Sequence, residues 1–397
     1  MRGVADFLGL RRSMIGLLGM VILVGMGEKL AERFLPIYLI ALGGGAISVG
    51  LLNGLDNLLS ALYSLPGGYL AQRLGTKRAL FIFNLMAMAG FLIVILIPAW
   101  EAVIAGSVLF LSWTAISLPA TMNLVAHVLP PTKRTMGVSM HSLVRRVPMA
   151  LGPLVGGVFI NVWGERVGVR LAFVGALGMA LVALVMQTRL IADDRPREPN
   201  PALVGGAHPL RWLRLMSPSL RNLLVSDILI RFCEQVPYAF VVVWCMKTIA
   251  SPVSALGFGV LTTIEMATAV LVYVPVAYLA DRSTKKPFIV ATFVFFTLFP
   301  LALLGCRSFW LLVPAFILRG LKEFGEPTRK ALIMDLAPAD AKAITFGVYY
   351  LMRDVVVSAA AFGGAFLWEM SPATNLLAAF ACGLAGTLWF AARGRDL

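Results

Sequence analysis

Charged residues are scarce in this sequence. Only 14% of its 397 residues are Asp, Glu, Lys or Arg, whereas 59% are hydrophobic, and a soluble domain carries about 25% charged residues. The scarcity of charge excludes both a water-soluble globule and a disordered chain. The four cysteines lie in apolar stretches without paired spacing, which excludes a disulfide scaffold.

The sequence also lacks the short motifs of enzymes and of ATP-driven pumps. Neither a Walker A motif nor the patterns G-x-S-x-G and H-E-x-x-H occur. The three histidines, His127, His141 and His208, have no metal-ligand spacing. We therefore expect no enzyme activity, no cofactor, no bound metal and no direct coupling to ATP.

Long hydrophobic runs are abundant. Runs such as 79–98 and 287–306 can each form a helix that crosses roughly 30 Å of hydrocarbon, whereas outer-membrane strands are segments of about ten alternating residues. The sequence thus predicts an all-α membrane protein with twelve transmembrane helices. The expected spans are residues 13–42, 46–71, 79–98, 101–129, 135–161, 167–188, 219–249, 251–280, 287–306, 308–337, 341–369 and 373–392.

The longest connection lies in the middle of the chain. Residues 189–218 are rich in charge, proline and glycine, which is typical of a linker. We expect this segment to be cytoplasmic and to join an N-terminal six-helix bundle, residues 1–188, to a C-terminal six-helix bundle, residues 219–397.

The formal net charge of +14 is concentrated on one side of the predicted spans. Basic residues cluster in the N-terminal tail, after spans 2, 4 and 8, in the linker and at the C-terminus, whereas the opposite loops have almost none. By the positive-inside rule both termini are cytoplasmic. We therefore expect an integral protein of the plasma membrane, the inner membrane in a bacterium, and no binding to nucleic acid.

The two predicted halves resemble each other in sequence. An offset of 209 positions pairs Pro66 with Pro275 and Asp56 with Glu265, and an offset of 207 pairs Arg146 with Arg353. Such parallel repeats predict a binding site near the bilayer midplane, where the halves meet.

A family resemblance appears at the end of span 2. Residues 68–78, GYLAQRLGTKR, resemble the loop motif G-x-L-A-D-R-x-G-R-K of the major facilitator superfamily, and residues 277–286, AYLADRSTKK, resemble its second copy. The resemblance implies a twelve-helix transporter that works by alternating access on a small molecule. It also implies a cytoplasmic gate made of Gly68, Gln72, Arg73, Gly75, Lys77, Asp281, Arg282 and Lys286. Gln72 and Thr76 depart from the motif, which weakens the first copy.

Residues 148–157, PMALGPLVGG, resemble the motif G-x-x-x-G-P-x-x-G-G of exporters that exchange substrate for protons, although Pro148 replaces its first glycine. Small residues at this spacing also serve close helix packing, and the span 4 arginine of many drug/proton antiporters is absent. We predict proton-coupled export. The alternatives are uptake or facilitated transport of an organic anion, a lipid-like substrate, and a non-transporting receptor.

Charged residues inside the spans are candidates for the substrate site, because ionisable groups in a membrane are costly and face an interior. Span 4 adds Trp113 and Asn123 in place of the missing arginine. Spans 3, 6, 9 and 12 have none near their middles and are expected to face lipid. The arginines can bind an anionic substrate or balance nearby carboxylates, and equal charge counts favour the second. Spacing predicts i to i+4 pairs Asp227–Arg231, Arg319–Glu323 and Lys322–Glu326. The candidate residues are Arg33, Trp113, Asn123, Arg145, Arg146, Arg231, Arg319, Glu323, Glu326, Arg329 and Arg353.

Glu28 and Glu32 are the candidates for the coupling proton. They lie on one face of span 1, about 6 Å apart along the axis, and we expect Lys29 and Arg33 to project roughly 100° away. Two carboxylates in low dielectric compete for a proton. Alternatively, an arginine from another helix neutralises each. Asp56, Glu234 and Glu265 are the reserves, and the expected partners are protons, a small-molecule substrate and the bilayer, with a monomeric protein.

Overall fold

The computed structural model describes residues 12–111, 113, 134–191, 216–280, 284–337 and 342–394. These residues are almost entirely helical and include no β-strand, which confirms the all-α fold class. The chain forms two compact units. Unit 1 comprises Met1–Gly43 and Leu59–Gly205, and unit 2 comprises Gly44–Leu58 and Gly206–Leu397.

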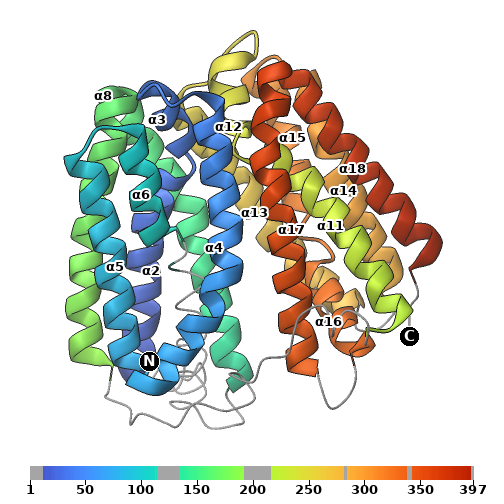
Figure 1. The fold of residues 1–397 in the computed structure, drawn as a ribbon, viewed down its shortest axis with the longest axis horizontal. Helices are drawn as coiled ribbons and strands as arrows, with labels where there is room; N and C mark the ends of the chain where they lie inside the picture. Colours follow the sequence, from blue (N-terminus) through green and yellow to red (C-terminus); the bar gives the residue numbers. More distant parts are fainter. Residues whose placement is uncertain are drawn as a thin grey trace. The chain divides into compact units, whose positions relative to one another are not determined.

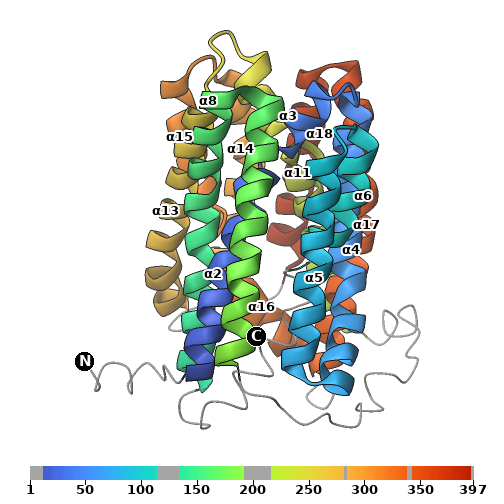
Figure 2. The same cartoon turned by 90° about the vertical axis from the view of Figure 1, so that its left-hand side faces the viewer.

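The helices of unit 1 run side by side, as Figures 1 and 2 show for α2, α5, α6 and α8. Predicted span 1 is divided near Arg33 into two helices, and predicted spans 5 and 6 form one assigned helix with a kink at Gly164, where φ is +77°. The described helices are α2 Arg12–Glu32, α3 Leu35–Ala41, α4 Gly45–Leu74, α5 Thr76–Leu96, α6 Trp100–Phe110 and α8 Arg134–Leu190; the first part of α4 clusters with unit 2.

Unit 2 contains two interrupted spans. In the first, α11 is followed by a one-turn helix and a π-helical turn, and the bend between the two parts is 42°. In the second, α15 and α16 replace the single predicted span 308–337. The described helices are α11 Pro218–Tyr238, α12 Val241–Val243, η2 Trp244–Thr248, α13 Ala255–Ala280, α14 Lys286–Gly305, α15 Phe309–Leu321, α16 Glu326–Leu336, α17 Lys342–Met370 and α18 Pro372–Arg393.

The break between α15 and α16 has a local cause. Pro327 occupies the first turn of α16, where its missing N–H costs nothing, and Gly325 precedes that helix. The Gly325 N–H donates a hydrogen bond to Thr292 Oγ1 at 2.5 Å, and a Cβ at Gly325 would lie 2.6 Å from the Phe288 carbonyl oxygen. The break is therefore packed tightly against α14.

Glycines bring equivalent helices together in the two units. In unit 1 a Cβ on Gly156 of α8 would lie 1.9 Å from the Leu30 carbonyl oxygen of α2. In unit 2 a Cβ on Gly364 of α17 would lie 2.3 Å from the Val236 carbonyl oxygen of α11. Both units therefore use a glycine for this helix contact, although Gly364 lies one position beyond the residue that the offset of 207 pairs with Gly156.

Several described helices have the length and hydropathy of membrane spans. Seven are long and apolar enough to cross a bilayer, and an eighth is added if α11 and residues 241–248 count as one bent span. Together with the all-helical architecture, this identifies an integral membrane protein.

Candidate functional site

Charged side chains of five helices in unit 2 form one connected series of ion pairs, which we call the unit 2 ion chain. Positive and negative groups alternate along it, and all its members are largely buried. In order, the chain runs Arg353, Asp227, Arg329, Glu326, Arg231, Glu234, Lys322, Glu265 and Arg319.

Asp227 lies near one end of the unit 2 ion chain and has several partners there. It is 1% exposed and accepts hydrogen bonds from Arg329 and from the Tyr349 hydroxyl at 3.0 Å, while Arg353 Nη1 lies 3.4 Å away. Arg329 also contacts Glu326 at 2.7 Å. Asp227 thereby ties α11 to α16 and α17.

Glu234 lies in the middle of the unit 2 ion chain. Its two oxygens lie 2.5 Å from Arg231 Nη1 and 2.8 Å from Lys322 Nζ. Lys322 also lies 3.6 Å from Glu265 Oε1, so it is shared between α11 and α13. Neutralising Glu234 would therefore weaken its ion pairs with both cations at once.

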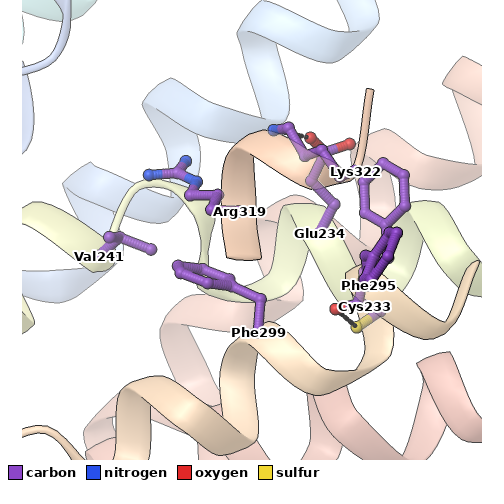
Figure 3. Close-up of a pocket in the computed structure, with 8 residues that line it drawn as sticks. Cys233, Glu234, Val241, Phe295, Phe299, Arg319 and Lys322 are labelled. Carbon is purple, nitrogen blue, oxygen red and sulfur yellow. Dashed lines mark hydrogen bonds and ion pairs between the residues drawn. The ribbon is translucent and has the colours of Figure 1, made fainter. Parts of the chain in front are cut away.

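A small pocket adjoins the other end of the chain. Figure 3 shows Arg319 near Phe299 and Val241, and Glu234 beside Lys322. The space is of the order of one water molecule. The lining residues are Cys233, Glu234, Val241, Phe295, Phe296, Phe299, Arg319 and Lys322.

The predicted pairing within single helices is not what holds this chain together. Asp227 pairs with Arg329 and Arg353 of other helices, and Lys322 pairs with Glu234 and Glu265, so the predicted pairs Asp227–Arg231 and Lys322–Glu326 are wrong. The reason for the second is the break at residues 322–325, which removes the helical register that an i to i+4 pair requires.

In unit 1, Glu28, Lys29 and Glu32 form a compact group on α2. We call Glu28 and Glu32 the acid pair. Lys29 Nζ lies 3.2 Å from Glu28 Oε1 and also contacts Glu32 Oε2. The expectation that Lys29 projects away from both acids is therefore wrong, because its long flexible stem curls back along the helix. Arg145 of α8 is close enough to Glu28 to interact electrostatically.

The glycines of the span 5 motif pack directly against this group. A Cβ on Gly152 would lie 2.6 Å from Lys29 Cβ, and Pro148 lies against Gly25 one turn away. The motif therefore brings the backbones of α2 and α8 together beside the acid pair.

The other predicted residues are scattered. Trp113 is buried, Arg146 is partly buried, and Asp56 lies in α4. The predicted Asn123, Asp281 and Arg282 lie outside the described residues, as does the side chain of Gln72, and Gly68 lies in α4. Of the remaining predicted gate residues, Gly75 connects α4 to α5 with φ of +86°, Arg73 lies in the last turn of α4, Lys77 lies in the first turn of α5 and Lys286 begins α14.

Sequence reasoning missed several polar partners. Tyr349 precedes Arg353 by one helical turn on α17, a spacing that could have indicated its contact with Asp227. Asn53 Nδ2 donates to the Gln235 carbonyl oxygen at 2.8 Å, and Asn57 Nδ2 to Gln235 Oε1 at 3.2 Å. Uncharged amides gave no signal, because they are common inside spans as packing groups.

The described residues contain no group of three His, Cys, Asp or Glu that could hold a metal ion. What the chain offers instead is a set of buried, mutually paired charges on membrane-spanning helices. Two helical units with repeated contacts and buried charges are the architecture of a polytopic membrane transporter.

Comparison with known proteins specifies the family. The model of the Major Facilitator Superfamily matches residues 17–250, more than half of the sequence. The chain belongs to this superfamily, as its loop motifs predicted. No curated protein sequence matches it significantly.

Solved structures agree on the fold. A peptide transporter POT in complex with sulfate is 16% identical, with 96% of this chain and 93% of that chain covered and a TM-score of 0.77. A variant of the nucleoside transporter NupG is 13% identical, with 98% and 100% covered and a TM-score of 0.80. A bacterial homologue of the human lysosomal transporter Spinster is 14% identical, with 96% and 95% covered and a TM-score of 0.69.

Proposed function

We propose that the protein is a secondary transporter that moves a small organic molecule by alternating access and exchanges it for protons, which bind at Glu28 and Glu32. One observation carries the proton assignment: Lys29 contacts both carboxylates. If either acid takes up a proton, Lys29 keeps the other as its counterion. Protonation of one of the two acids therefore leaves Lys29 with an anion.

The unit 2 ion chain responds differently to a proton. Glu234 is the nearest carboxylate of both Arg231 and Lys322, so its neutralisation would weaken two ion pairs together. Arg231 would then depend on Glu326 at 3.7 Å and Lys322 on Glu265 at 3.6 Å, and each of these acids already serves another cation. Weakening buried ion pairs between helices is unfavourable. We therefore assign the proton to the acid pair of unit 1 and the substrate to the neighbourhood of the unit 2 ion chain, with Asp56, Glu234 and Glu265 as reserve proton sites.

The nature of the substrate follows from two considerations. The peptide and nucleoside transporters with similar folds are named for small organic substrates, and a POT family transporter was solved with 5-aminolevulinic acid. Polar and charged side chains in spans suit such molecules. Besides the members of the unit 2 ion chain, the proposed substrate-facing residues are Arg33, Trp113, Asn123, Arg145, Arg146 and Glu323.

The direction we propose is export, on the resemblance of residues 148–157 to the exporter motif. The close packing of Gly152 and Gly156 against α2 supplies a physical role for that motif beside the acid pair. We further propose a monomer in the plasma membrane, bacterial inner membrane if the source is a bacterium, with both termini cytoplasmic, bundles 1–188 and 219–397, and a gate formed by the two loop motifs.

A screen in proteoliposomes tests this function. Vesicles with an acidic lumen are given an external mixture of organic acids, amines and neutral compounds, and the lumen is analysed by mass spectrometry. An antiporter accumulates its substrate as protons leave, and nigericin, which collapses the gradient, abolishes the accumulation. Entry that stops at the external concentration and is unaffected by nigericin indicates a facilitator, and accumulation that needs an acidic exterior indicates symport; both contradict proton-coupled export.

A further inference from the structure

We propose that the pocket beside Arg319 binds the carboxylate of an aromatic organic acid, with Arg319 as its anion-binding residue and Phe299 as a packing surface for its ring. This inference rests on the proposed transport function and specifies the substrate class. It concerns only groups of unit 2.

Arg319 uses its Nε for an ion pair and has terminal N–H donors that can bind a second anion. Its side chain is 4% exposed, and its Nε lies 3.4 Å from Glu265 Oε1. Among the described residues no other carboxylate lies within ion-pair distance of its guanidinium. A guanidinium has five N–H donors and holds a carboxylate best through two parallel hydrogen bonds, so the terminal nitrogens of Arg319 can still receive an anion.

Aromatic rings surround the same guanidinium. Arg319 Cζ lies 5.2 Å from the centroid of Phe299 and 5.7 Å from those of Tyr238 and Phe316. These rings exclude water and fix the position of the cation. An anion that reaches Arg319 is therefore bound in a dry surrounding, where an ionic hydrogen bond is stronger than in water.

The remaining walls suit an aromatic ring better than a second charged group. Phe295, Phe296, Phe299 and Val241 make most of the lining apolar. Glu234 also lines the pocket, but Arg231 at 2.5 Å and Lys322 at 2.8 Å balance its charge. One arginine with apolar walls matches a singly charged carboxylate, whereas a doubly charged phosphate needs more donors.

The size of the pocket sets the order of events. Its space, of the order of one water molecule, admits at most one carboxylate oxygen and no ring. Entry of the whole carboxylate and its ring requires the phenylalanine side chains to rotate. Binding should therefore depend on both the charge of Arg319 and the shape of Phe299.

Equilibrium binding of radiolabelled benzoate to the full-length protein in nanodiscs tests the proposal. Competition is measured with unlabelled benzoate, cyclohexanecarboxylate, benzylamine and chloride. We expect benzoate to compete about tenfold better than cyclohexanecarboxylate, and benzylamine and chloride not to compete in the same range. Equal competition by chloride, by benzylamine or by cyclohexanecarboxylate overturns the proposal.

Variants assign the binding to these residues. Arg319→Gln should weaken benzoate binding at least tenfold, and Arg319→Lys should weaken it less, since the charge remains. Phe299→Leu should weaken benzoate about threefold or more but leave cyclohexanecarboxylate unchanged. The matched controls are Arg393→Gln, at the end of α18, and Phe91→Leu, in the core of unit 1; neither should alter binding.

A folding defect in Arg319→Gln is controlled by the double variant Arg319→Gln/Glu265→Gln, which removes both charges of the pair. If the double variant is folded and still binds benzoate as the wild type does, Arg319 is not the anion site. Benzoate binding without any transport would contradict the proposed function alone. Proton-driven transport of other compounds without benzoate binding would contradict this inference alone.

Discussion

The buried charges of the two units are organised in opposite ways. In unit 1, two acids on a single helix share one lysine. In unit 2, the ion chain crosses five helices, and its carboxylates each lie between cations. The first arrangement can lose one negative charge and keep its lysine paired, whereas the second cannot lose one without disturbing several helices. The difference assigns proton exchange to one unit and cohesion and anion binding to the other.

The contrast lies in the side chains and not in the backbone. Gly156 and Gly364 make similar close contacts in the two units, with Leu30 and Val236 respectively. Internal repeats thus provide the same helix packing twice, and the charged residues placed on it have diverged.

The largest expected loss of stability comes from removing the carboxylate of Asp227 from the unit 2 ion chain. Asp227→Leu should lower the free energy of unfolding by roughly 3 kcal/mol, because Arg329 and Arg353 lose the buried counterion that ties their helices to α11 and keep only Glu326 and Asp354 of their own helices. In unit 1, Glu32→Gln should cost at most about 1 kcal/mol, since Lys29 retains Glu28. Unfolding in SDS, followed by tryptophan fluorescence, compares the two. Equal losses would remove the distinction between the units.

The next effect tests what the units share. Gly156→Ala and Gly364→Ala should each cost about 1–3 kcal/mol, because the new methyl group would collide with a backbone carbonyl of the neighbouring helix. Gly178→Ala and Gly363→Ala are matched controls, since a Cβ there meets no described atom within 4 Å. The same unfolding assay applies. If only one of the two close-contact variants is destabilised, the contacts are not equivalent.

The smallest effect concerns a single hydrogen bond of the ion chain. Tyr349→Phe removes the hydroxyl that donates to Asp227 at 3.0 Å, and should cost about 0.5–1.5 kcal/mol. Tyr350→Phe is its control, because it keeps the ring that lies 4.3 Å from Arg353 Cζ. The same SDS unfolding assay measures both variants. A larger loss for Tyr350→Phe than for Tyr349→Phe would show that the hydroxyl of Tyr349 is not a working part of the chain.

Much of the fold could be predicted, because each cause is local. Apolar runs of about twenty residues predict spans, and the loop motif around Gly75 marks the connection between two spans, where Gly75 has the positive φ of a tight turn. The break before α16 was also signalled, by Gly325 and Pro327. It was missed because the expected span 308–337 was drawn across the charged residues 322–330.

The pairing of charges could not be predicted in the same way. Helical spacing tells which residues share a face, but Lys322 contacts acids of α11 and α13, and Asp227 contacts arginines of α16 and α17. Lys29 reaches both acids through a flexible stem that backbone direction does not fix. Partners between helices depend on packing, which a single sequence does not specify.

The most direct test of the account compares driven and undriven transport in two variants. Using the compound found in the transport screen, gradient-driven accumulation and counterflow at equal pH are measured for Glu28→Gln/Glu32→Gln, with Glu101→Gln, an exposed acid at the start of α6, as control. The account predicts that the double variant loses gradient-driven accumulation and retains counterflow, while the control keeps both. Gradient-driven accumulation at the wild-type level in the double variant would contradict the assignment of the proton to unit 1.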